Sequence, residues 1–307
     1  MKIVYLGSPD FAVLPLRKMV EAGYEIAAVY TQPDRARGKR GKELLPTPVK
    51  AAALEMGLTV HTPARINEPE VLAQMAAYEP DLIVVVAFGQ LLKKELLDIP
   101  ALGCVNIHGS LLPEYRGAAP IQRAVMDGKK ESGVTIMYLD EGMDSGDMIL
   151  KQVIPFDPDE TFGTLHDKLQ DAGAELLMQA LPMIQQGTAP RQPQDHSKAT
   201  FAAKISRDEE QVDWSWDADR FHARVRGLDP FPGAYVLHGD KRLKLFGCSL
   251  AEGGGEPGEI MDVKDAGITV ACGSGAVRIA QVQPEGKGRM PAVAFARGHQ
   301  IKQGGKL

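Results

Sequence analysis

Short apolar runs and segments of helical spacing alternate along most of this chain. Apolar runs at 2–6 and 25–31 enclose a segment, 11–22, whose apolar residues recur every three or four positions. The nearly unbroken apolar run at 81–89 is typical of a strand that is buried on both faces. Strands that alternate with helices in this way predict an α/β fold with a mostly parallel, Rossmann-like sheet.

The same criteria predict the other elements of this part of the chain. Helices are expected at 49–56, 68–78, 90–97, 119–127 and 161–186, and strands at 58–61, 104–108, 134–140 and 148–154. The first turn reads GSPDF and lacks the G-x-G-x-x-G spacing that lets the backbone approach a pyrophosphate. We therefore expect the Rossmann-like topology without a bound dinucleotide.

The pattern changes after the last long helix. Positions 187–206 are polar and dotted with proline, which is typical of a linker. Beyond them, a predicted helix at 218–227 precedes short, glycine-separated strands that reach position 283 and are typical of a small barrel. We therefore predict a first domain at 1–188, a linker at 189–206 and a smaller β-rich domain at 207–307.

Composition narrows the class of protein. The content of 44% hydrophobic and 24% charged residues is that of an ordinary globular protein. The three cysteines are far apart and odd in number, which fits a reducing compartment rather than a disulfide framework. We find neither an apolar stretch of the ~20 residues needed to cross a membrane nor the histidine spacing of a metal site. We expect a cytoplasmic protein without a metal, and a monomer because the sequence shows no obvious interface helix.

One short stretch carries a concentrated positive charge. The formal net charge is −5, which argues against a protein that coats nucleic acid generally. Between positions 35 and 42, however, the chain reads RARGKRGK, with five cations and no acid. Such a run is most often a solvated surface, but Gly38 and Gly41 grant the backbone freedom that suits a loop that orders on RNA.

The candidate chemistry lies at the end of the strand at 104–108. Residues two apart on a strand project from the same face, so Asn106 and His108 project together where the strand ends. In an open α/β sheet, ligands bind at the carboxyl ends of the strands. An isolated pair of this kind is more often a buried amide and a structural histidine, so the surrounding residues decide between the two interpretations.

Several segments together resemble the enzymes that transfer the formyl group of 10-formyltetrahydrofolate. They are NIHGSLLPEYRGAAPI at 106–121 and GVTIMYLDEGMDSGDMIL at 133–150. The segments GSPDFAVLPL, TQPDRARGKRGK and VQPEGKGRMPAVAFARGHQIKQG resemble, in particular, the branch of that family that formylates methionine on initiator Met-tRNA. The resemblance covers essentially the whole chain, and it implies a formyltransferase catalytic domain at 1–188 and an OB-like barrel at 207–307.

The resemblance also implies roles for individual residues. Asn106, His108 and Asp144 would form the catalytic set. The tetrahydrofolate-binding turn would be Ser110, Leu111, Leu112 and Pro113, and the pocket walls Phe88, Gly89, Gln90, Leu91, Leu92, Tyr138, Leu139 and Asp140. Contacts to tRNA would come from Arg35, Arg37, Lys39, Arg40, Lys42, Lys287 and Arg289. Two simpler interpretations stay open: Asp144 as an acid of a glycine-rich turn, and the leucines of the SLLP segment as inward-packing residues.

The expected reaction is the transfer of a formyl group from 10-formyltetrahydrofolate to the α-amino group of methionine on initiator Met-tRNA. Such a transfer passes through a tetrahedral intermediate with an oxyanion, which Asn106 would stabilise by hydrogen bonding. Our hypothesis is that a cationic His108 polarises the formyl oxygen together with Asn106, and that Asp144 places the water that carries the proton.

Other functions remain open on the sequence alone. The nearest are folate enzymes that formylate a purine-pathway ribonucleotide or an amino-sugar nucleotide, or that hydrolyse the formyl donor. A different class would be a Rossmann-like sensor or a dehydrogenase. The basic stretch and the additional domain favour tRNA as the acceptor, and the missing glycine fingerprint disfavours a dehydrogenase.

Overall fold

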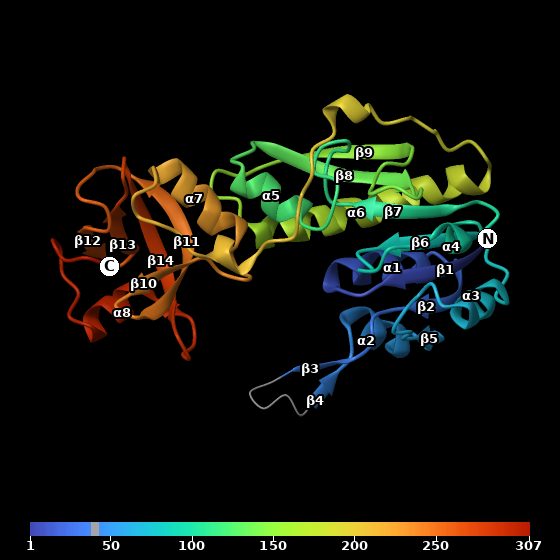
Figure 1. Cartoon of the computed structure of the whole chain (residues 1–307), viewed down its shortest axis with the longest axis horizontal. Helices are drawn as coiled ribbons and strands as arrows, with labels where there is room; N and C mark the ends of the chain where they lie inside the picture. The colour runs from blue at the N-terminus through green and yellow to red at the C-terminus, as the bar shows by residue number, and fades with distance from the viewer. Residues whose placement is uncertain (38–42) are drawn as a thin grey trace. The chain divides into compact units, whose positions relative to one another are not determined.

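The computed structural model describes residues 1–37 and 43–307 of the chain (Figure 1). These residues separate into two compact units. The first contains Met1–Gly117, Gly133–Ile154 and Asp167–Phe201, and the second contains Ala118–Ser132, Pro155–His166 and Ala202–Leu307. Two short segments that precede position 188 therefore belong to the second unit.

A seven-stranded sheet forms the centre of the first unit, in the order β5-β2-β1-β6-β7-β8-β9 (Figure 1). The pairings from β5 to β7 are parallel, and β8 runs antiparallel to β7. The strands are β1 (Lys2–Gly7), β2 (Glu25–Tyr30), β5 (Val60–His61), β6 (Leu82–Val86), β7 (Cys104–His108), β8 (Glu131–Tyr138) and β9 (Met148–Pro155). The mostly parallel sheet predicted from the sequence is thus confirmed.

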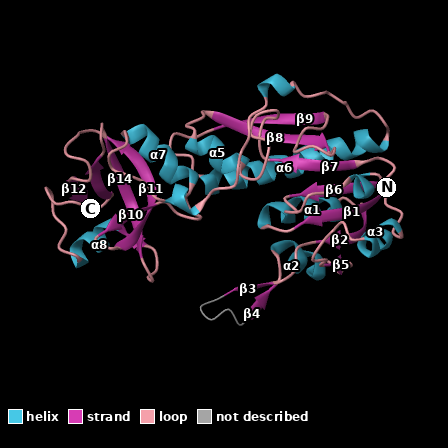
Figure 2. Ribbon diagram, viewed as in Figure 1, coloured by secondary structure: helices cyan, strands magenta, loops and turns pink. Residues whose placement is uncertain are grey.

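Helices cover both faces of this sheet (Figure 2). They are η1 (Asp10–Ala12), α1 (Val13–Glu21), α2 (Pro48–Glu55), α3 (Pro69–Ala76), α4 (Lys94–Leu97) and α6 (Phe162–Gln185). On one face, Met75 of α3 and Leu96 of α4 belong to the same buried cluster as Leu6 and Ile83 of the sheet. On the other face, α6 approaches β7 so closely that a Cβ at Gly173 would lie 2.8 Å from Ile107 Cγ2.

Two short antiparallel strands lie at the basic stretch: β3 (Arg35–Arg37) is its first part, and β4 (Glu43–Leu45) follows it. The two strands lie between β2 and α2 in the chain (Figure 1). The next helix, α2, has a well-defined N-terminus. The Thr47 side chain caps it by accepting a hydrogen bond from Lys50 N at 3.1 Å, and Pro48 occupies the first helical position.

The second unit is built around an antiparallel sheet in the order β10-β11-β14-β13-β12, with β15 paired to β14. Its strands are β10 (Tyr235–His238), β11 (Lys241–Ala251), β12 (Ile260–Lys264), β13 (Gly267–Ala271), β14 (Ala276–Pro284) and β15 (Met290–Pro291). Its helices are α5 (Pro120–Met126), α7 (Ala218–Gly227), α8 (Ala292–Gly298) and the short η3 (Arg207–Glu210). This separate β-rich unit agrees with the fold class predicted from the sequence.

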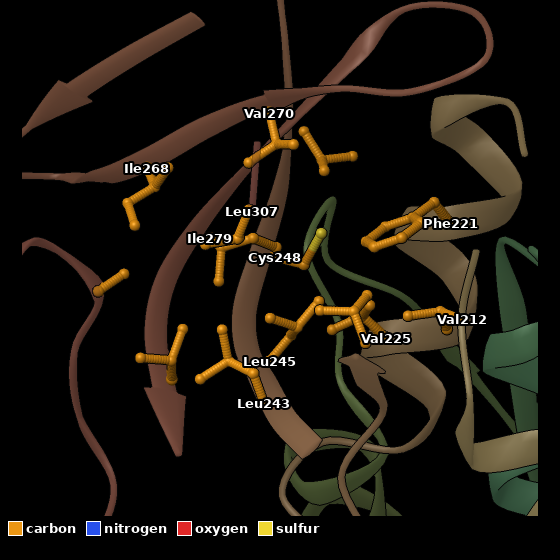
Figure 3. Close-up of a cluster of buried hydrophobic side chains, with 14 of the residues drawn as sticks. Val212, Phe221, Val225, Leu243, Leu245, Cys248, Ile268, Val270, Ile279 and Leu307 are labelled. Carbon is orange, nitrogen blue, oxygen red and sulfur yellow. The ribbon is translucent and has the colours of Figure 1, made fainter. Parts of the chain in front are cut away.

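One hydrophobic cluster holds the second unit together. Figure 3 shows side chains of β11, β13, β14 and α7 that point toward a common centre, among them Phe221, Val225, Leu245, Cys248 and Ile279. Helix α5 packs on α7 with so little space that a Cβ at Gly227 would lie 2.3 Å from Met126 Cγ. The early segment that carries α5 is therefore part of this core.

Two helices of the structure differ from the sequence prediction. The helix predicted at 90–97 is reduced to Lys94–Leu97, because polar side chains satisfy the preceding backbone: Asn67 Oδ1 accepts from Lys93 N at 3.0 Å, and Asn67 Nδ2 donates to Leu91 O at 2.8 Å. The helix α8 was not predicted at all.

Segment 189–201, predicted as part of a linker, is hydrogen-bonded to the first unit. Met148 and Gln192 exchange backbone hydrogen bonds of 2.9 and 3.0 Å, and Arg116 N donates to Thr200 O at 2.9 Å. The segment therefore forms part of the first unit up to Phe201.

Candidate active site

Strand β7 places Asn106 and His108 together at the carboxyl edge of the sheet. Asn106 lies opposite Val85 of β6 and Met137 of β8, and His108 lies opposite Thr135 of β8. Both side chains are on the face of the sheet opposite to Ile107, whose neighbour is α6. The two are almost buried, with exposed fractions of 9% for Asn106 and 5% for His108.

Hydrogen bonding fixes the tautomer of His108. Its Nε2 lies 2.9 Å from the backbone oxygen of Tyr115. A carbonyl oxygen only accepts hydrogen bonds, so Nε2 carries the proton and donates it. The other ring nitrogen, Nδ1, faces the carboxylate of Asp144, with 3.7 Å between Nδ1 and Oδ2. In the neutral ring, Nδ1 is therefore the nitrogen with a free lone pair.

The loop after β8 brings Asp144 to this position. Asp144 has a left-handed backbone with φ of 47°, a conformation that is unusual for a residue other than glycine. Its Oδ2 accepts a hydrogen bond from Gly117 N at 2.8 Å, which ties the loop to the turn that follows β7. The spacing of 3.7 Å to His108 is too long for a direct hydrogen bond, but it lets the carboxylate attract the ring electrostatically once the ring is protonated.

Two buried residues that the sequence analysis did not single out support this loop. Gln194 Nε2 donates to Asp144 O and to Gly146 O, each at 2.8 Å. Gln194 Oε1 accepts from Arg116 Nε at 3.0 Å and from Arg116 Nη2 at 2.7 Å. Arg116 and Gln194 are each 5% exposed. The only sequence signal was the placement of Arg116 inside the YRGAAPI segment, since Gln194 falls in the predicted linker.

Several residues of the predicted folate turn are held by the protein itself. Ser110 Oγ donates to Glu114 O at 2.6 Å, and Leu112 packs in a buried cluster with Met137 and Met148. Thr135 Oγ1 donates to Ser110 O and accepts from Leu112 N, so β8 shapes the backbone of the turn. The inward-packing interpretation therefore describes the Leu112 side chain, while Leu111 and Pro113 are partly exposed.

The predicted pocket walls are distributed over two places. Residues 88–92 follow β6, the parallel neighbour of β7, so they begin at the same sheet edge as His108. Phe88 and Leu92 are buried, Leu91 is exposed, and Gln90 binds the backbone of Ala64 and Ile66; Gly89 has φ of 85°.

The second set of predicted walls lies toward the other end of β7. Tyr138 is opposite Val105, on the sheet face that Asn106 and His108 do not share. Leu139 N donates to Cys104 O at 2.8 Å, and Asp140 accepts hydrogen bonds from Ser145 Oγ. These three residues therefore do not converge on His108, although the loop that they begin does return there at Asp144.

The predicted tRNA contacts are partly visible. Arg35 is exposed on β3, and Arg37 ends that strand. Lys39, Arg40 and Lys42 lie outside the described residues. In the second unit, Lys287 is exposed, whereas Arg289 stacks over Phe246 at 4.0 Å and lies 3.5 Å from Asp229.

Two negative findings concern the described parts of the chain. Within residues 1–37 and 43–307, no group of three or more His, Cys, Asp or Glu side chains is arranged to hold a metal ion. Over the same residues, no helix has both the length and the apolar character needed to cross a bilayer.

Comparison with known proteins defines the class of this chain. The family model for formyl transferase matches residues 1–181, and the model for the formyl transferase C-terminal domain matches residues 204–300. Together they cover most of the sequence. The chain belongs to the formyl transferase family.

The more particular similarity is to enzymes that act on tRNA. The chain is 47% identical to methionyl-tRNA formyltransferase of Moorella thermoacetica, over 99% of this chain and 98% of that protein. It is 44% identical to methionyl-tRNA formyltransferase of Geobacter sulfurreducens, over 100% of this chain and 96% of that protein.

Solved structures share the fold at low sequence identity. HypX from Aquifex aeolicus, in complex with tetrahydrofolic acid, matches with a TM-score of 0.68 and 21% identity, over 96% of this chain and 47% of that chain. An N-formyltransferase from Helicobacter canadensis, in complex with folinic acid and dTDP-3-aminofucose, also matches with a TM-score of 0.68, at 16% identity over 92% of this chain and 100% of that chain.

Proposed function

We propose that this protein transfers the formyl group of 10-formyltetrahydrofolate to the α-amino group of methionine on initiator Met-tRNA. The observation that carries the proposal is the similarity to methionyl-tRNA formyltransferases along the full chain, at 44–47% identity. The approach of His108 to Asp144 beside Asn106, at the carboxyl edge of the sheet, supports it with a chemically suitable site. The protein would act in the cytoplasm, as a monomer and without a metal.

In the proposed reaction, the amine nitrogen attacks the formyl carbon and forms the new C–N bond. The carbonyl electrons move to oxygen, and the side-chain amide of Asn106 donates a hydrogen bond to the resulting oxyanion. One donor of this kind typically contributes ~10²–10³ in rate. When the intermediate collapses, the bond from the formyl carbon to N10 of the folate breaks, and N10 takes up a proton.

His108 would manage the proton of the attacking nitrogen. Because Nε2 already donates to Tyr115 O, only Nδ1 can accept that proton. Protonation makes the ring cationic, and the Asp144 carboxylate, 3.7 Å away, stabilises that charge. The cationic ring then stabilises the oxyanion together with Asn106 and, as the intermediate collapses, returns the proton to the leaving nitrogen N10. General acid–base catalysis of this kind contributes ~10²–10⁴ in rate.

The folate co-substrate would occupy the edge of the sheet between the segments that follow β6 and β7. Leu111 and Pro113, which are partly exposed, follow the polar pair Asn106 and His108 closely in the chain. A pocket for a flat ring with polar groups at its edge combines apolar walls with a few placed polar groups. Ser110 and Leu112 would shape the turn that borders the pocket, since their side chains bind or pack within the protein and Thr135 binds Ser110 O and Leu112 N.

An acceptor competition tests the proposed function directly. The purified protein is given 10-formyltetrahydrofolate with Met-tRNA, free methionine, glycinamide ribonucleotide, an amino-sugar nucleotide or water. We expect formylation of Met-tRNA alone at an appreciable rate. Formylation of a ribonucleotide or a sugar nucleotide, with Met-tRNA inert, would replace the proposal by one of the alternatives.

The basic stretch is proposed to bind the RNA backbone, and charge removal tests this. Neutralising Arg37, Lys39 and Arg40 to glutamine should raise the KM for Met-tRNA and flatten its dependence on salt concentration, because fewer phosphate contacts release fewer counterions. The KM for the formyl donor should not change. As a control, three cations already held in ion pairs, Arg17, Lys94 and Lys264, are replaced in the same way. An unchanged salt slope in the first variant would contradict the role.

A further inference from the structure

Gln194 occupies a central position in the hydrogen bonding around Asp144. All four hydrogen-bonding positions of its amide are used: both N–H groups reach carbonyl oxygens of the Asp144 loop, and the oxygen receives two N–H groups of Arg116. The next residue after Arg116 is Gly117, whose N–H binds the Asp144 carboxylate. The turn after β7, the Asp144 loop and segment 189–201 therefore meet at one amide side chain.

The contacts of Gln194 are with the loop backbone and not with the Asp144 carboxylate. They fall at Asp144 O and Gly146 O, on both sides of Ser145. Asp144 itself has a left-handed backbone, which needs support from its surroundings. A donor that binds both carbonyl oxygens fixes the direction in which the Asp144 side chain leaves the loop, and hence its approach to His108.

The chemistry of Gln194 suits this task in a way that a carboxylate would not. Glutamate would accept from Arg116 equally well but would have no N–H to donate to the two carbonyl oxygens. Arg116 fixes the orientation of the amide, because a guanidinium that donates through two nitrogens identifies the accepting atom as the oxygen. Arg116 also contacts Nδ1 of His196 at 3.3 Å, within the same segment.

We propose that Gln194, oriented by Arg116, is a positioning residue for formyl transfer: it holds the Asp144 loop so that the carboxylate faces Nδ1 of His108. This inference rests on the proposed catalytic roles of His108 and Asp144. The proposal assigns a function to segment 189–201, which follows α6 in the chain. This segment would support the active site although it is not part of the sheet.

A double-variant cycle separates this role from a merely structural one. Gln194→Met should lower kcat by about 10²-fold, the typical effect of misplacing a catalytic group by about 1 Å, and leave the KM for 10-formyltetrahydrofolate within about twofold. Asp144→Asn removes the carboxylate whose position Gln194 controls. The variant with both changes should therefore be no slower than Asp144→Asn alone. Multiplying effects would overturn the proposal.

Gln192→Met is the matched control. Gln192 lies two residues away in the same segment, its side chain is exposed, and its contacts to Met148 are made by the backbone. We expect this variant to keep the kcat and the thermal midpoint of the original protein. A loss of kcat equal to that of Gln194→Met would mean that any change in the segment perturbs the site, and it would overturn the specific role of Gln194.

A second variant covers the case in which Gln194→Met does not fold. Gln194→Glu keeps the shape and the bonds from Arg116 but loses both donations to the loop, so it should show the same loss of kcat with an intact circular dichroism spectrum. In this variant, the ring nitrogen chemical shifts of His108 in ¹⁵N NMR should resemble those of Asp144→Asn at the same pH. Failure of both variants to fold would show that Gln194 is structural and would refute the proposal.

The same experiments distinguish a failure of this inference from a failure of the proposed function. If the unaltered protein and Gln192→Met do not formylate Met-tRNA, or if Asp144→Asn has full activity, the proposed function or its catalytic set is wrong. If those results are as expected but Gln194→Met retains full kcat, only the positioning role is wrong.

Discussion

A single backbone oxygen determines how His108 takes part in the proposed reaction. The carbonyl of Tyr115 holds the Nε2 proton and leaves Nδ1 as the nitrogen that faces Asp144. The sequence placed an amide, an imidazole and a carboxylate near one another, but it gave no means of telling the two ring nitrogens apart. Nδ1 is therefore the atom that would carry the added proton of a cationic His108.

Asn106 offers the most direct test at the scale of one residue. Asn106→Asp keeps the size of the side chain but replaces the N–H donor by an oxygen, so the oxyanion loses its hydrogen bond and meets a negative charge instead. We expect kcat to fall by at least ~10²-fold, with the KM for the formyl donor nearly unchanged. Steady-state kinetics at fixed Met-tRNA would measure this.

The matched control for Asn106 is Gln211→Glu, which makes the same exchange of an amide for a carboxylate in the second unit, where the Gln211 oxygen accepts from the Tyr235 hydroxyl at 3.4 Å. Its effect should be confined to thermal stability. A kcat for Asn106→Asp within threefold of the original would exclude Asn106 as the donor to the oxyanion.

At the scale of elements, the close approach of α6 to β7 supports the strand that carries Asn106 and His108. Gly173 permits this approach, because an added Cβ would lie 2.8 Å from Ile107 Cγ2 and 3.2 Å from Val134 Cγ2. Gly173→Val should therefore lower the free energy of unfolding by about 1–3 kcal/mol through overpacking, measured by urea denaturation. The control Gly298→Ala, where no atom lies within 4 Å, should be neutral or slightly stabilising.

Strand β7 and the sheet of the second unit also determine the reactivity of the three cysteines. Burial raises the pKa of Cys104 to about 12 and that of Cys272 to about 11, and it raises the pKa of Cys248 well above its ordinary value. At pH 8, about a thousandth or less of Cys104 and Cys272 would be thiolate. We expect iodoacetamide to label none of them in the folded protein and all three in denaturant, as followed by mass spectrometry.

Rapid labelling of any one cysteine without denaturant would show that its part of the core opens. The comparison across the two units would then tell which hydrophobic cluster is the less stable one.

The helices and strands show which features can be predicted from the sequence and which cannot. Apolar periodicity is a property of the chain itself, so β1, β6, β7, α6 and α7 were predicted within a few residues. The helix predicted at 90–97 was shorter than expected, because Asn67, distant in sequence, supplies hydrogen bonds to that backbone. No local pattern contains such information.

The same limit applies to the candidate site. Asn106 and His108 share a face by strand alternation, and the motif resemblance added Asp144. Gln194 and Arg116 have polar side chains that become buried only through contacts between distant parts of the chain. The sequence therefore did not reveal their role, and Gln194 lies in a polar, proline-dotted segment that is typical of a linker. Tyr138 was predicted near the same site because of the resemblance. The register of β8 on β7 instead places Tyr138 opposite Val105.

At the scale of the whole molecule, an ion pair within the second unit joins an early helix, α5, to the later part of the chain. Arg123 of α5 donates two hydrogen bonds to the Glu209 carboxylate, and this interaction lowers the pKa of Glu209 from 4.5 to about 2. A lowered folded-state pKa contributes stability above pH 4.5 that is lost as the pH falls from 4.5 toward 2. Because both side chains are partly exposed, we expect this contribution to be about 1 kcal/mol.

The variant Glu209→Gln tests this dependence. It should be less stable than the original protein at pH 6, and the difference should shrink as the pH falls from 4.5 toward 2, since the original carboxylate becomes protonated over this range. Urea denaturation at several pH values would measure both curves, with Glu210→Gln, the neighbouring residue, as a control. A difference that stays constant over this range would show that the carboxylate charge is not the cause.

The hydrogen bonding of segment 189–201 also determines where this chain can be joined to a related chain to make a hybrid protein. A hybrid joined at position 188, where the sequence suggests a border, would combine the Asp144 loop of one parent with the Gln194 segment of another. With a junction after Phe201, Arg116, Gln194 and the Asp144 loop would all come from the same parent. This junction would still divide the second core, because α5 comes from the early part of the sequence, so a successful exchange has to carry residues 118–132 and 155–166 along with the tail.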